Sequence, residues 1–364
     1  MNVTVRGRSR HFRTVEFEAA ANSVVLIEQR LLPHVFRRIK TPDYRATAAA
    51  IRDMVVRGAG AIGATAAYGL AQGARAFRGR QLEAFERHVD GVFETLKNAR
   101  PTAIDPLNAL REVRTAMQVG TTVSERQERA LAAAERFAEE DVEHCRAIGI
   151  HGAGLIRPNA TVLTHCNAGW LAFVDIGTAT APMYAAQEQG RTFSVLCDET
   201  RPRCQGASLT AWELAQQGIR HHVIADNAAG SLMQRGQVDL VIVGSDRVLG
   251  RTGHVANKIG TYTKAVLAHR HGIPFYVAIP LSTLDWEVRD WKKIPIEERH
   301  EDEVLGAWGV QPGSSRRGYV RIANPGSPAI NPGFDVTPPE LITGIITPAG
   351  IFRPGELGKL RPRG

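Results

Sequence analysis

Reactive and polar side chains follow several short apolar runs in the second half of the chain. His165-Cys166-Asn167 comes after residues 161–164, Asp198-Glu199-Thr200-Arg201 after 193–196, Asp226-Asn227 after 222–225, Ser245-Asp246-Arg247 after 238–243, and Ser282-Thr283 after 275–279. If these runs are parallel strands, their carboxyl ends share the sheet edge where such sheets bind ligands. The thiol of Cys166 and the carboxyl of Asp246 are then candidates for acid-base or nucleophilic chemistry in one crevice.

Each of these residues also has an ordinary structural interpretation. An aspartate after a strand is often the N-cap of the next helix, and a free cysteine is often a small buried hydrophobe. Asp226-Asn227 fits the cap interpretation best. The coincidence of such residues at several strand ends nevertheless favours a functional site.

A glycine loop, Arg57-Gly58-Ala59-Gly60-Ala61-Ile62-Gly63, contains the spacing GxGxxG. A dinucleotide site with this spacing needs a preceding strand, whereas residues 42–56 have helical spacing. We therefore predict a loop that opens a helix over 61–76, whose free amide groups bind a phosphate with the help of Arg57.

A second polar loop, residues 252–261, is predicted to enter another helix. Its Lys258 is a further candidate phosphate ligand, although a lysine at a helix start is more often only solvated. The histidine pairs His221-His222 and His269/His271 lack the i, i+4 spacing of a helical metal site, so no metal is expected.

The first 150 residues are predicted to form a mainly helical domain with short strands. Residues 14–17 and 23–27 have strand patterns, and Thr41-Pro42 resembles the start of a helix with an apolar stripe. Further apolar spacing predicts a helix over 82–96, and Ser124 with Gln127 resembles a capping box for a long helix.

Residues 151–364 are predicted to form a Rossmann-like domain, because their apolar runs alternate with helix-length segments. The fold class is therefore α/β: a small N-terminal sheet plus a helical domain, followed by a Rossmann-like parallel-sheet domain. The stretch 311–339 is rich in proline and glycine and is predicted to wrap the surface before a short segment at 338–346.

Composition limits the partners. The net charge of +8 suits an anionic ligand, and without a cluster of basic and aromatic residues we expect no nucleic-acid partner. No apolar run has secretory or membrane-spanning length, so we expect a cytoplasmic protein with no membrane partner. The four cysteines form no CxxC pair and are expected to be free thiols.

Six segments in order carry a family resemblance: RGAGAIGATAAYG (57–69), THCNAG (164–169), DETRPRCQGASLTAWEL (198–214), GSDRV (244–248), VANKIGTY (255–262) and NPGFDVTPPELITGIIT (331–347). Together they resemble the methylthioribose-1-phosphate isomerase family, which is related to regulatory subunits of the guanine-nucleotide exchange factor of translation initiation. The resemblance spans nearly the whole chain.

The resemblance implies a homodimer without a cofactor, with Cys166 and Asp246 as the catalytic pair. The implied ligands of the sugar phosphate are Arg57, Gly58, Ala59, the Arg100 of the NARPTA stretch, Gln205, Asn257 and Lys258.

The chain departs from the family pattern near the implied substrate. Gly60 stands where RGAPAIG has proline, the loop after Asp246 is one residue longer and reads RTGH, and GSDRV replaces GADR. Trp170 and Phe173 enlarge the segment after the cysteine. These changes bear on the identity of the sugar more than on the reaction.

The implied reaction converts 5-methylthioribose 1-phosphate into 5-methylthioribulose 1-phosphate. Because a phosphate on the anomeric oxygen blocks spontaneous ring opening, a protonated Asp246 is expected to donate to the ring oxygen. Cys166 then either takes the C2 proton or assists a hydride shift; only the first route lets solvent deuterium reach C1.

Three alternatives remain open. The same reaction could act on 5-deoxyribose 1-phosphate, ribose 1,5-bisphosphate or another aldose 1-phosphate. The chain could instead be a non-catalytic regulatory subunit that senses a sugar phosphate or nucleotide. An NAD-dependent dehydrogenase would depend on the GxGxxG spacing alone.

Overall fold

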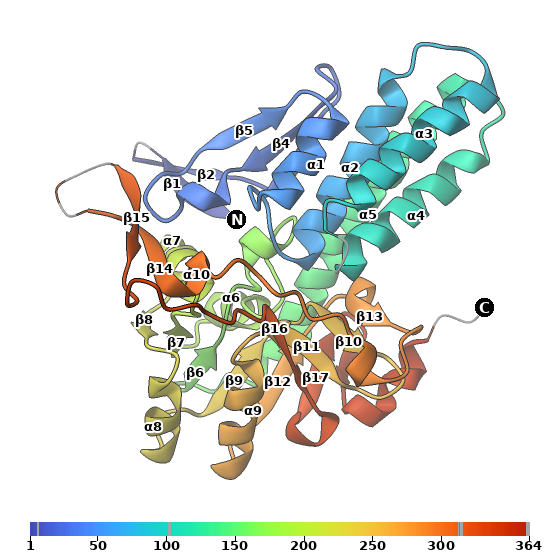
Figure 1. Ribbon diagram of the computed structural model, residues 1–364. Helices are drawn as coiled ribbons and strands as arrows, with labels where there is room; N and C mark the ends of the chain where they lie inside the picture. Colours follow the sequence, from blue (N-terminus) through green and yellow to red (C-terminus); the bar gives the residue numbers. More distant parts are fainter. Residues whose placement is uncertain (6, 101–102, 312, 314–315, 362–364) are drawn as a thin grey trace.

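The computed structural model describes residues 1–5, 7–100, 103–311, 313 and 316–361 (Figure 1). The chain opens with a hairpin of β1 (Asn2–Val5) and β2 (Arg8–His11). β3 (Val15–Glu18), β4 (Ser23–Ile27) and β5 (Arg38–Thr41) then form a three-stranded antiparallel sheet. The two strands that the sequence predicts in this region are confirmed.

Five helices follow: α1 (Tyr44–Arg52), α2 (Ala59–Ala76), α3 (Leu82–Lys97), α4 (Ile104–Gln118) and α5 (Val123–Ala153). Every residue from Ala59 to Ala74 is buried, because α2 packs against α3, α4 and α5. Its alanines and glycines allow this close approach. α2 is therefore the central helix of the N-terminal half, and its first turn faces the rest of the molecule.

The C-terminal half contains a seven-stranded sheet with the order β8-β7-β6-β9-β12-β17-β18. Its strands are β6 (Thr161–Thr164), β7 (Ser194–Asp198), β8 (His221–Ile224), β9 (Leu240–Val243), β12 (Phe275–Ala278), β17 (Gly344–Thr347) and β18 (Gly350–Phe352). All pairs are parallel except β17 with β18. The six parallel strands have the Rossmann order 3-2-1-4-5-6, and the predicted fold class is confirmed.

Helices cover this sheet, and alternate strand residues point into two separate apolar clusters. Val162 and Ile242 belong to one cluster, whereas Leu163 and Val241 belong to the other. The helices are α6 (Ala181–Glu188), α7 (Ala211–Gln216), α8 (Ala228–Gln234) and α9 (Thr261–Arg270). Burial on both faces explains why the strands are continuous apolar runs.

A second sheet was not predicted from the sequence. It has the order β13-β10-β11-β16, with β13 (Leu284–Asp285), β10 (Arg247–Leu249), β11 (Val255–Lys258) and β16 (Phe334–Thr337). β14 (Gly306–Val310) and β15 (Arg317–Arg321) form a projecting hairpin after α10 (Asp302–Leu305) (Figure 1). The stretch 311–339 thus contains two strands: β15 pairs with the neighbouring β14, and β16 pairs with the distant β11. Lys258 is the last residue of β11 and does not start a helix.

Two predicted helix starts are wrong. The N-cap of α1 is Asp43, whose carboxylate accepts hydrogen bonds from the Arg45 and Ala46 amides, and Thr41 ends β5. The N-cap of α5 is Thr122, whose hydroxyl accepts from the Glu125 amide, two residues before the predicted Ser124. The proposed domain boundary at residue 150 falls within α5, and the division into 1–150 and 151–364 stays a prediction.

Among the described residues, no helix has both the length and the apolar character needed to cross a membrane.

The cap of α5 gives the first testable prediction. Thr122→Ala should lower the free energy of unfolding by about 1 kcal/mol, because the Glu125 amide loses its acceptor. Ser124→Ala should change it by less than about 0.5 kcal/mol, since the Ser124 hydroxyl donates to the exposed Glu128 and caps no amide among the described residues. Urea denaturation measures both, and a larger effect at Ser124 would contradict the assignment.

Candidate functional site

Cys166 lies just beyond β6, in a backbone conformation that is unusual for a residue with a side chain. Its φ is 66°, in the left-handed region, and it is only 7% exposed. The Thr200 hydroxyl accepts the Cys166 N–H at 2.8 Å, and the Thr210 hydroxyl donates to the Cys166 carbonyl at 2.7 Å. Such backbone strain persists only where surrounding contacts hold it, and it clusters at functional sites.

The residue after the cysteine joins the two halves of the chain. The guanidinium of Arg57 donates to the Asn167 side-chain oxygen at 2.7 Å and to the Asn167 carbonyl at 2.9 Å. The Asn167 amide in turn donates to the buried carboxylate of Glu213 at 2.9 Å. Arg57 therefore has a fixed orientation beside the loop that carries Cys166.

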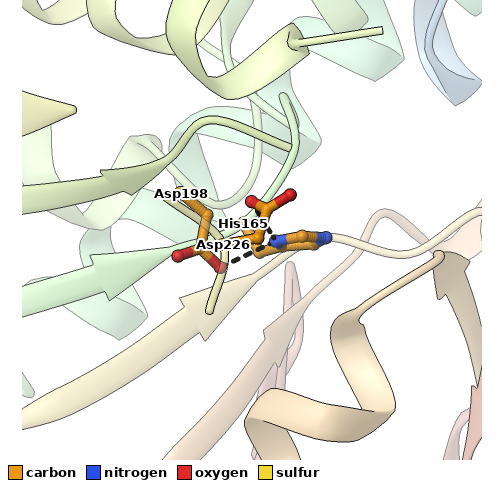
Figure 2. A group of neighbouring side chains, drawn as sticks. All are labelled: His165, Asp198 and Asp226. Atoms are coloured by element: carbon orange, nitrogen blue, oxygen red, sulfur yellow. Dashed lines mark hydrogen bonds and ion pairs between the residues drawn. The ribbon is translucent and has the colours of Figure 1, made fainter. Parts of the chain in front are cut away.

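The residue before the cysteine belongs to a polar group with two aspartates, drawn in Figure 2. His165 Nδ1 lies 2.8 Å from Asp198 Oδ2 and 4.0 Å from Asp226 Oδ1, and its Nε2 lies 2.8 Å from the Ile259 carbonyl. The Lys264 ammonium contacts the same Asp198 oxygen at 3.1 Å. This group ties the end of β6 to the ends of β7 and β8 and to the loop after β11.

His165, Asp198 and Asp226 also bring potential metal-ligating atoms within 4.8 Å of one another. These atoms already have protein partners. Asp226 accepts the Thr200 and Arg201 amides at 2.7 Å each, so its side chain does not cap a helix. Of the predicted pair Asp226-Asn227, Asn227 is the N-cap residue of α8, without a side-chain hydrogen bond. Since Lys264 also places an ammonium against Asp198, the donor set fits a hydrogen-bonded group better than a cation site.

Asp246 follows β9, which is the strand next to β6 in the parallel sheet. Its amide donates to the Ala256 carbonyl of β11 at 3.0 Å. Burial raises the pKa of Asp246, against the opposing effects of Lys258, Arg57 and Arg100. Since β6 and β9 flank the point where the strand order reverses, Cys166 and Asp246 both lie at the topological switch point of the sheet.

Lys258, at the end of β11, lies within electrostatic reach of both candidate catalytic groups. Burial lowers the pKa of Lys258, and the Cys166 thiol and the Asp246 carboxyl both raise it. Its ammonium lies 5.0 Å from the centre of the Phe334 ring. The neighbouring Asn257 is buried, and its amide donates to the Thr261 hydroxyl at 3.0 Å.

Two cavities adjoin this region. The larger, about 350 Å³, is lined by Arg57 and Gln205 together with Arg30, Arg203 and Arg317. The Gln205 side-chain oxygen is buried and has no hydrogen-bond partner among the described residues. This volume lies in the range of small-molecule sites, and its arginines suit an anion.

The smaller cavity, about 30 Å³, is lined by Gly58, Ala59, Arg100, Asp105 and Asp246, among others. Arg57 and Gly58 are adjacent, so the two cavities flank the start of α2. Helix α2 begins at Ala59, two residues before the predicted start at 61, and no strand immediately precedes it, as the sequence predicted. Gly58 has a φ of 93°, and a Cβ there would lie 2.3 Å from Ala172, so glycine is required.

Arg100 lines this smaller cavity, and few contacts offset the cost of burying its charge. Its guanidinium lies 3.5 Å from the Glu297 carboxylate, its Nε has no partner among the described residues, and burial lowers its pKa. Pro101 and Thr102 of the NARPTA stretch lie outside the described residues.

The nine predicted site residues thus fall into three groups. Arg57 and Gln205 line the larger cavity; Gly58, Ala59, Arg100 and Asp246 line the smaller one. Cys166, Asn257 and Lys258 are buried and are not among the described residues that line either cavity. Lys258 belongs to the third group and also interacts electrostatically with Asp246 of the second group.

The residues that hold these groups in place were not predicted from the sequence. Thr210 is the last residue of an irregular turn, Gly206–Thr210, and Glu213 follows it in α7. The polar partners of both residues come from the loop after β6. No periodic pattern marks such residues. Thr200 belongs to the polar segment Asp198-Glu199-Thr200-Arg201 that follows a predicted strand.

The structure gives a reason for the departure at Gly60. A Cβ at this position would lie 2.2 Å from Asp141 Oδ1 and 2.4 Å from Phe173 Cδ1. Two larger groups therefore occupy the space beside the helix start. The large Phe173, which follows the cysteine, thus packs against the small Gly60.

Fold and site together define an α/β protein of the Rossmann order whose switch point holds a thiol, a carboxyl and several cations. Residues 55–354 match the model of the initiation factor 2 subunit family. The chain belongs to this family. The resemblance read from the six sequence segments is confirmed.

Individual relatives share the chain nearly end to end. A methylthioribose-1-phosphate isomerase of Sinorhizobium medicae is 50% identical over 355 residues, which cover 94% of each chain. The crystal structure of 5-methylthioribose 1-phosphate isomerase from Pyrococcus horikoshii is 41% identical, with a TM-score of 0.84 over 97% of each chain. A structure described as translation initiation factor eIF-2B, subunit delta, from A. fulgidus is also 41% identical, with a TM-score of 0.79 over 94% of this chain and 96% of the other.

The packing at Gly60 gives the second prediction. Gly60→Ala should lower the free energy of unfolding by about 1–3 kcal/mol, because Asp141 and Phe173 must move to admit the methyl group. Gly91→Ala is a matched control in α3, where an added Cβ meets nothing within 4 Å, and it should raise stability by about 0.5–1 kcal/mol. Chemical denaturation compares the two; a neutral Gly60→Ala would contradict the packing argument.

Proposed function

We propose that this chain is an aldose-ketose isomerase that converts 5-methylthioribose 1-phosphate into 5-methylthioribulose 1-phosphate. The observation that carries the proposal is the gathering of Cys166 and Asp246 at the switch point, with Lys258 within electrostatic reach of both. The names of relatives that share nearly half of the residues over the whole chain support the same substrate.

In this proposal Asp246 is the general acid that opens the sugar ring. A carboxyl must hold its proton near neutral pH to donate it, and burial raises the pKa of Asp246 in that direction. The three nearby cations oppose this effect, so the acid needs burial to remain protonated. Cys166 is the group that assists hydrogen transfer from C2 to C1.

The phosphate ligands in this proposal come from both halves of the chain. Arg57, Gly58 and Ala59 lie at the positive end of α2, and Arg100 and Gln205 supply further donors. Lys258 and Asn257 come from β11. Charge-assisted hydrogen bonds from several directions suit a phosphate dianion and require no metal or organic cofactor.

A second candidate function is a non-catalytic regulatory subunit that senses a sugar phosphate. The specific observation in its favour is the equally identical A. fulgidus structure, which is described as a translation initiation factor subunit. Such a protein would need the anion ligands but not the thiol and carboxyl. The presence of both Cys166 and Asp246 favours the enzyme.

The third prediction distinguishes these functions. We expect turnover of 5-methylthioribose 1-phosphate, with a higher kcat/KM than for 5-deoxyribose 1-phosphate or ribose 1,5-bisphosphate. Cys166→Ser and Asp246→Asn should each lower kcat at least about 10²-fold, the usual scale for acid-base groups. A coupled or NMR assay of the ketose product measures these rates.

Two results would argue against this assignment. Binding of the sugar phosphates without turnover of any of them would favour the sensor. Cys145→Ala serves as a thiol control, because Cys145 is buried in α5 and is not among the described residues lining either cavity. Near-normal kcat in Cys166→Ser or Asp246→Asn would remove that residue from the mechanism.

We also propose that the protein is a cytoplasmic homodimer. Its four cysteines are free, as expected in a reducing compartment. Large apolar side chains are exposed on and after the projecting hairpin, with Trp308 62%, Ile322 67% and Ile330 84% exposed. Patches of this kind commonly mark protein interfaces.

The fourth prediction concerns this assembly. Light scattering after size-exclusion chromatography should give twice the chain mass of 39.7 kDa. Trp308→Ser combined with Ile322→Ser should weaken a dimer that uses this surface. A monomer at micromolar concentration would contradict the proposed dimer, and an unchanged dimer in the double variant would place its interface elsewhere.

A further inference from the structure

His165 is buried between the end of β6 and Cys166, and both of its ring nitrogens meet oxygen atoms. Nδ1 lies 2.8 Å from Asp198 Oδ2, and Nε2 lies 2.8 Å from the Ile259 carbonyl oxygen. A carbonyl and an ionised carboxylate only accept hydrogen bonds, whereas a neutral imidazole has one N–H and one bare nitrogen. The two contacts together therefore require a proton on each nitrogen, which is the imidazolium form.

The buried carboxylate of Asp198 depends on this ring for its compensation. Asp198 is fully buried, and its Oδ1 has no hydrogen-bond partner among the described residues. Its Oδ2 meets both His165 and the Lys264 ammonium, at 2.8 Å and 3.1 Å. A buried charge needs paired charges and donors. The contact with the ring is therefore stabilising when Nδ1 donates and repulsive when Nδ1 is bare.

The other charged groups around the ring also favour a second cation. Asp226, after β8, has its Oδ1 4.0 Å from Nδ1, and Asp335 of β16 interacts with the ring electrostatically. Burial raises the pKa of Asp335, against the opposing effects of its amide donors, His165 and Lys264. With a neutral histidine, Lys264 of α9 would face these three carboxylates without a second charge from the ring. An imidazolium makes the cluster more nearly neutral.

The same ring joins the two segments that carry the candidate catalytic thiol and the buried lysine. His165 immediately precedes Cys166 in the chain. Ile259, whose carbonyl oxygen meets Nε2, immediately follows Lys258. The fit is close, because Gly260 has a φ of 102° and a Cβ there would lie 3.0 Å from the ring atom Cε1. The hydrogen bond from Nε2 therefore holds the end of β11 against the end of β6.

We propose that His165 is a positioning residue: as an imidazolium held by Asp198, it fixes the lysine-bearing end of β11 beside the loop that carries Cys166. This inference rests on the proposed isomerase function for its purpose, because the lysine and the thiol are assigned to the substrate site there. The two ring protons and the hydrogen bond are properties of the ligand-free protein. They can therefore be tested separately from turnover.

The direct test, our fifth prediction, is NMR of the ligand-free full chain with ¹⁵N-labelled histidine rings. The ring of His165 is assigned through its own backbone amide, so that the assignment needs no variant. At neutral pH both ring nitrogens should carry a directly bonded proton, and the Nε2 proton should exchange slowly with water because the Ile259 carbonyl accepts it. A bare ring nitrogen or a rapidly exchanging Nε2 proton would overturn the proposal, whatever the behaviour of variants.

Two substitutions separate the hydrogen bond to Ile259 from the charge, because both remove the charge. The side-chain amide of asparagine takes the place of Nδ1 and can still donate to Asp198, whereas that of glutamine reaches the place of Nε2 and can donate to the Ile259 carbonyl. His165→Asn should lower kcat/KM for 5-methylthioribose 1-phosphate by about 10²-fold, since the end of β11 is no longer held. His165→Gln should lower it by about 10-fold or less.

An exposed histidine provides the matched control for these variants. His222 is exposed on β8, and His222→Asn should leave kcat/KM unchanged. Circular dichroism and thermal unfolding establish that each variant is folded at the assay temperature. Equal losses in His165→Asn and His165→Gln would show that the ring contributes its charge and no link to Ile259, and would overturn the positioning role.

The two kinds of measurement separate the failure of this inference from the failure of the proposed function. Two ring protons with slow exchange at Nε2, but no turnover of any aldose 1-phosphate, would support the charged His165 and reject the isomerase. Turnover with a bare ring nitrogen would support the isomerase and reject the charged His165.

Discussion

The buried carboxylate of Glu213 organises the loop on which the site depends. Its two oxygens accept four hydrogen bonds, from the Asn167 side chain, the Trp170 and Leu171 amides and the Tyr184 hydroxyl, at 2.9–3.1 Å. Four donors saturate the acceptor capacity of a carboxylate, and this offsets the cost of burying the charge. The loop comes so close that a Cβ at Gly169 would lie 1.9 Å from a Glu213 oxygen.

This constraint extends to the groups proposed to carry the chemistry. Asn167, held by Glu213, orients Arg57, and the Thr210 hydroxyl that donates to the Cys166 carbonyl comes from the turn just before Glu213. The strained backbone of Cys166 is thus supported from one side by the segment before α7 and from the other by Thr200 after β7. Contacts with the segment after β7 and with the turn before α7, and not the cysteine's own preference, hold the backbone conformation of Cys166.

The electrostatic balance of the cleft is the second requirement. Binding an anion needs cations, and Arg57, Arg100 and Lys258 all come near Asp246. The same cations would deprotonate the acid that the proposed reaction needs. Burial of Asp246 opposes them, and the carboxylate of Glu297 adds a negative charge on the same side of the balance. The N-terminal half of the chain thus affects the charge state of Asp246 through Arg57 and Arg100.

The sequence alone determined the elements whose stability is local or strongly patterned. The apolar runs of the parallel sheet and the stripe of α3 are readable, because burial on one or both faces imposes a period on the residues. Since parallel strands end at one edge, the same pattern predicts that Cys166 and Asp246 lie at a shared edge of the sheet. The caps of α1 and α5 lay within a few residues of their predicted positions, because several neighbouring side chains there are capable of capping a helix.

Only the tertiary structure decided how distant segments complete the site. β11 pairs with β16 across about eighty residues, and this pairing makes Lys258 the end of a strand. Glu213, Asp105 and Asp141 are buried carboxyls with no pattern of their own, since their burial depends on partners from other elements. Gly60 departs from its family motif because Phe173 and Asp141 fill the adjoining space. Such contacts join residues through space, so periodicity along the chain carries no record of them.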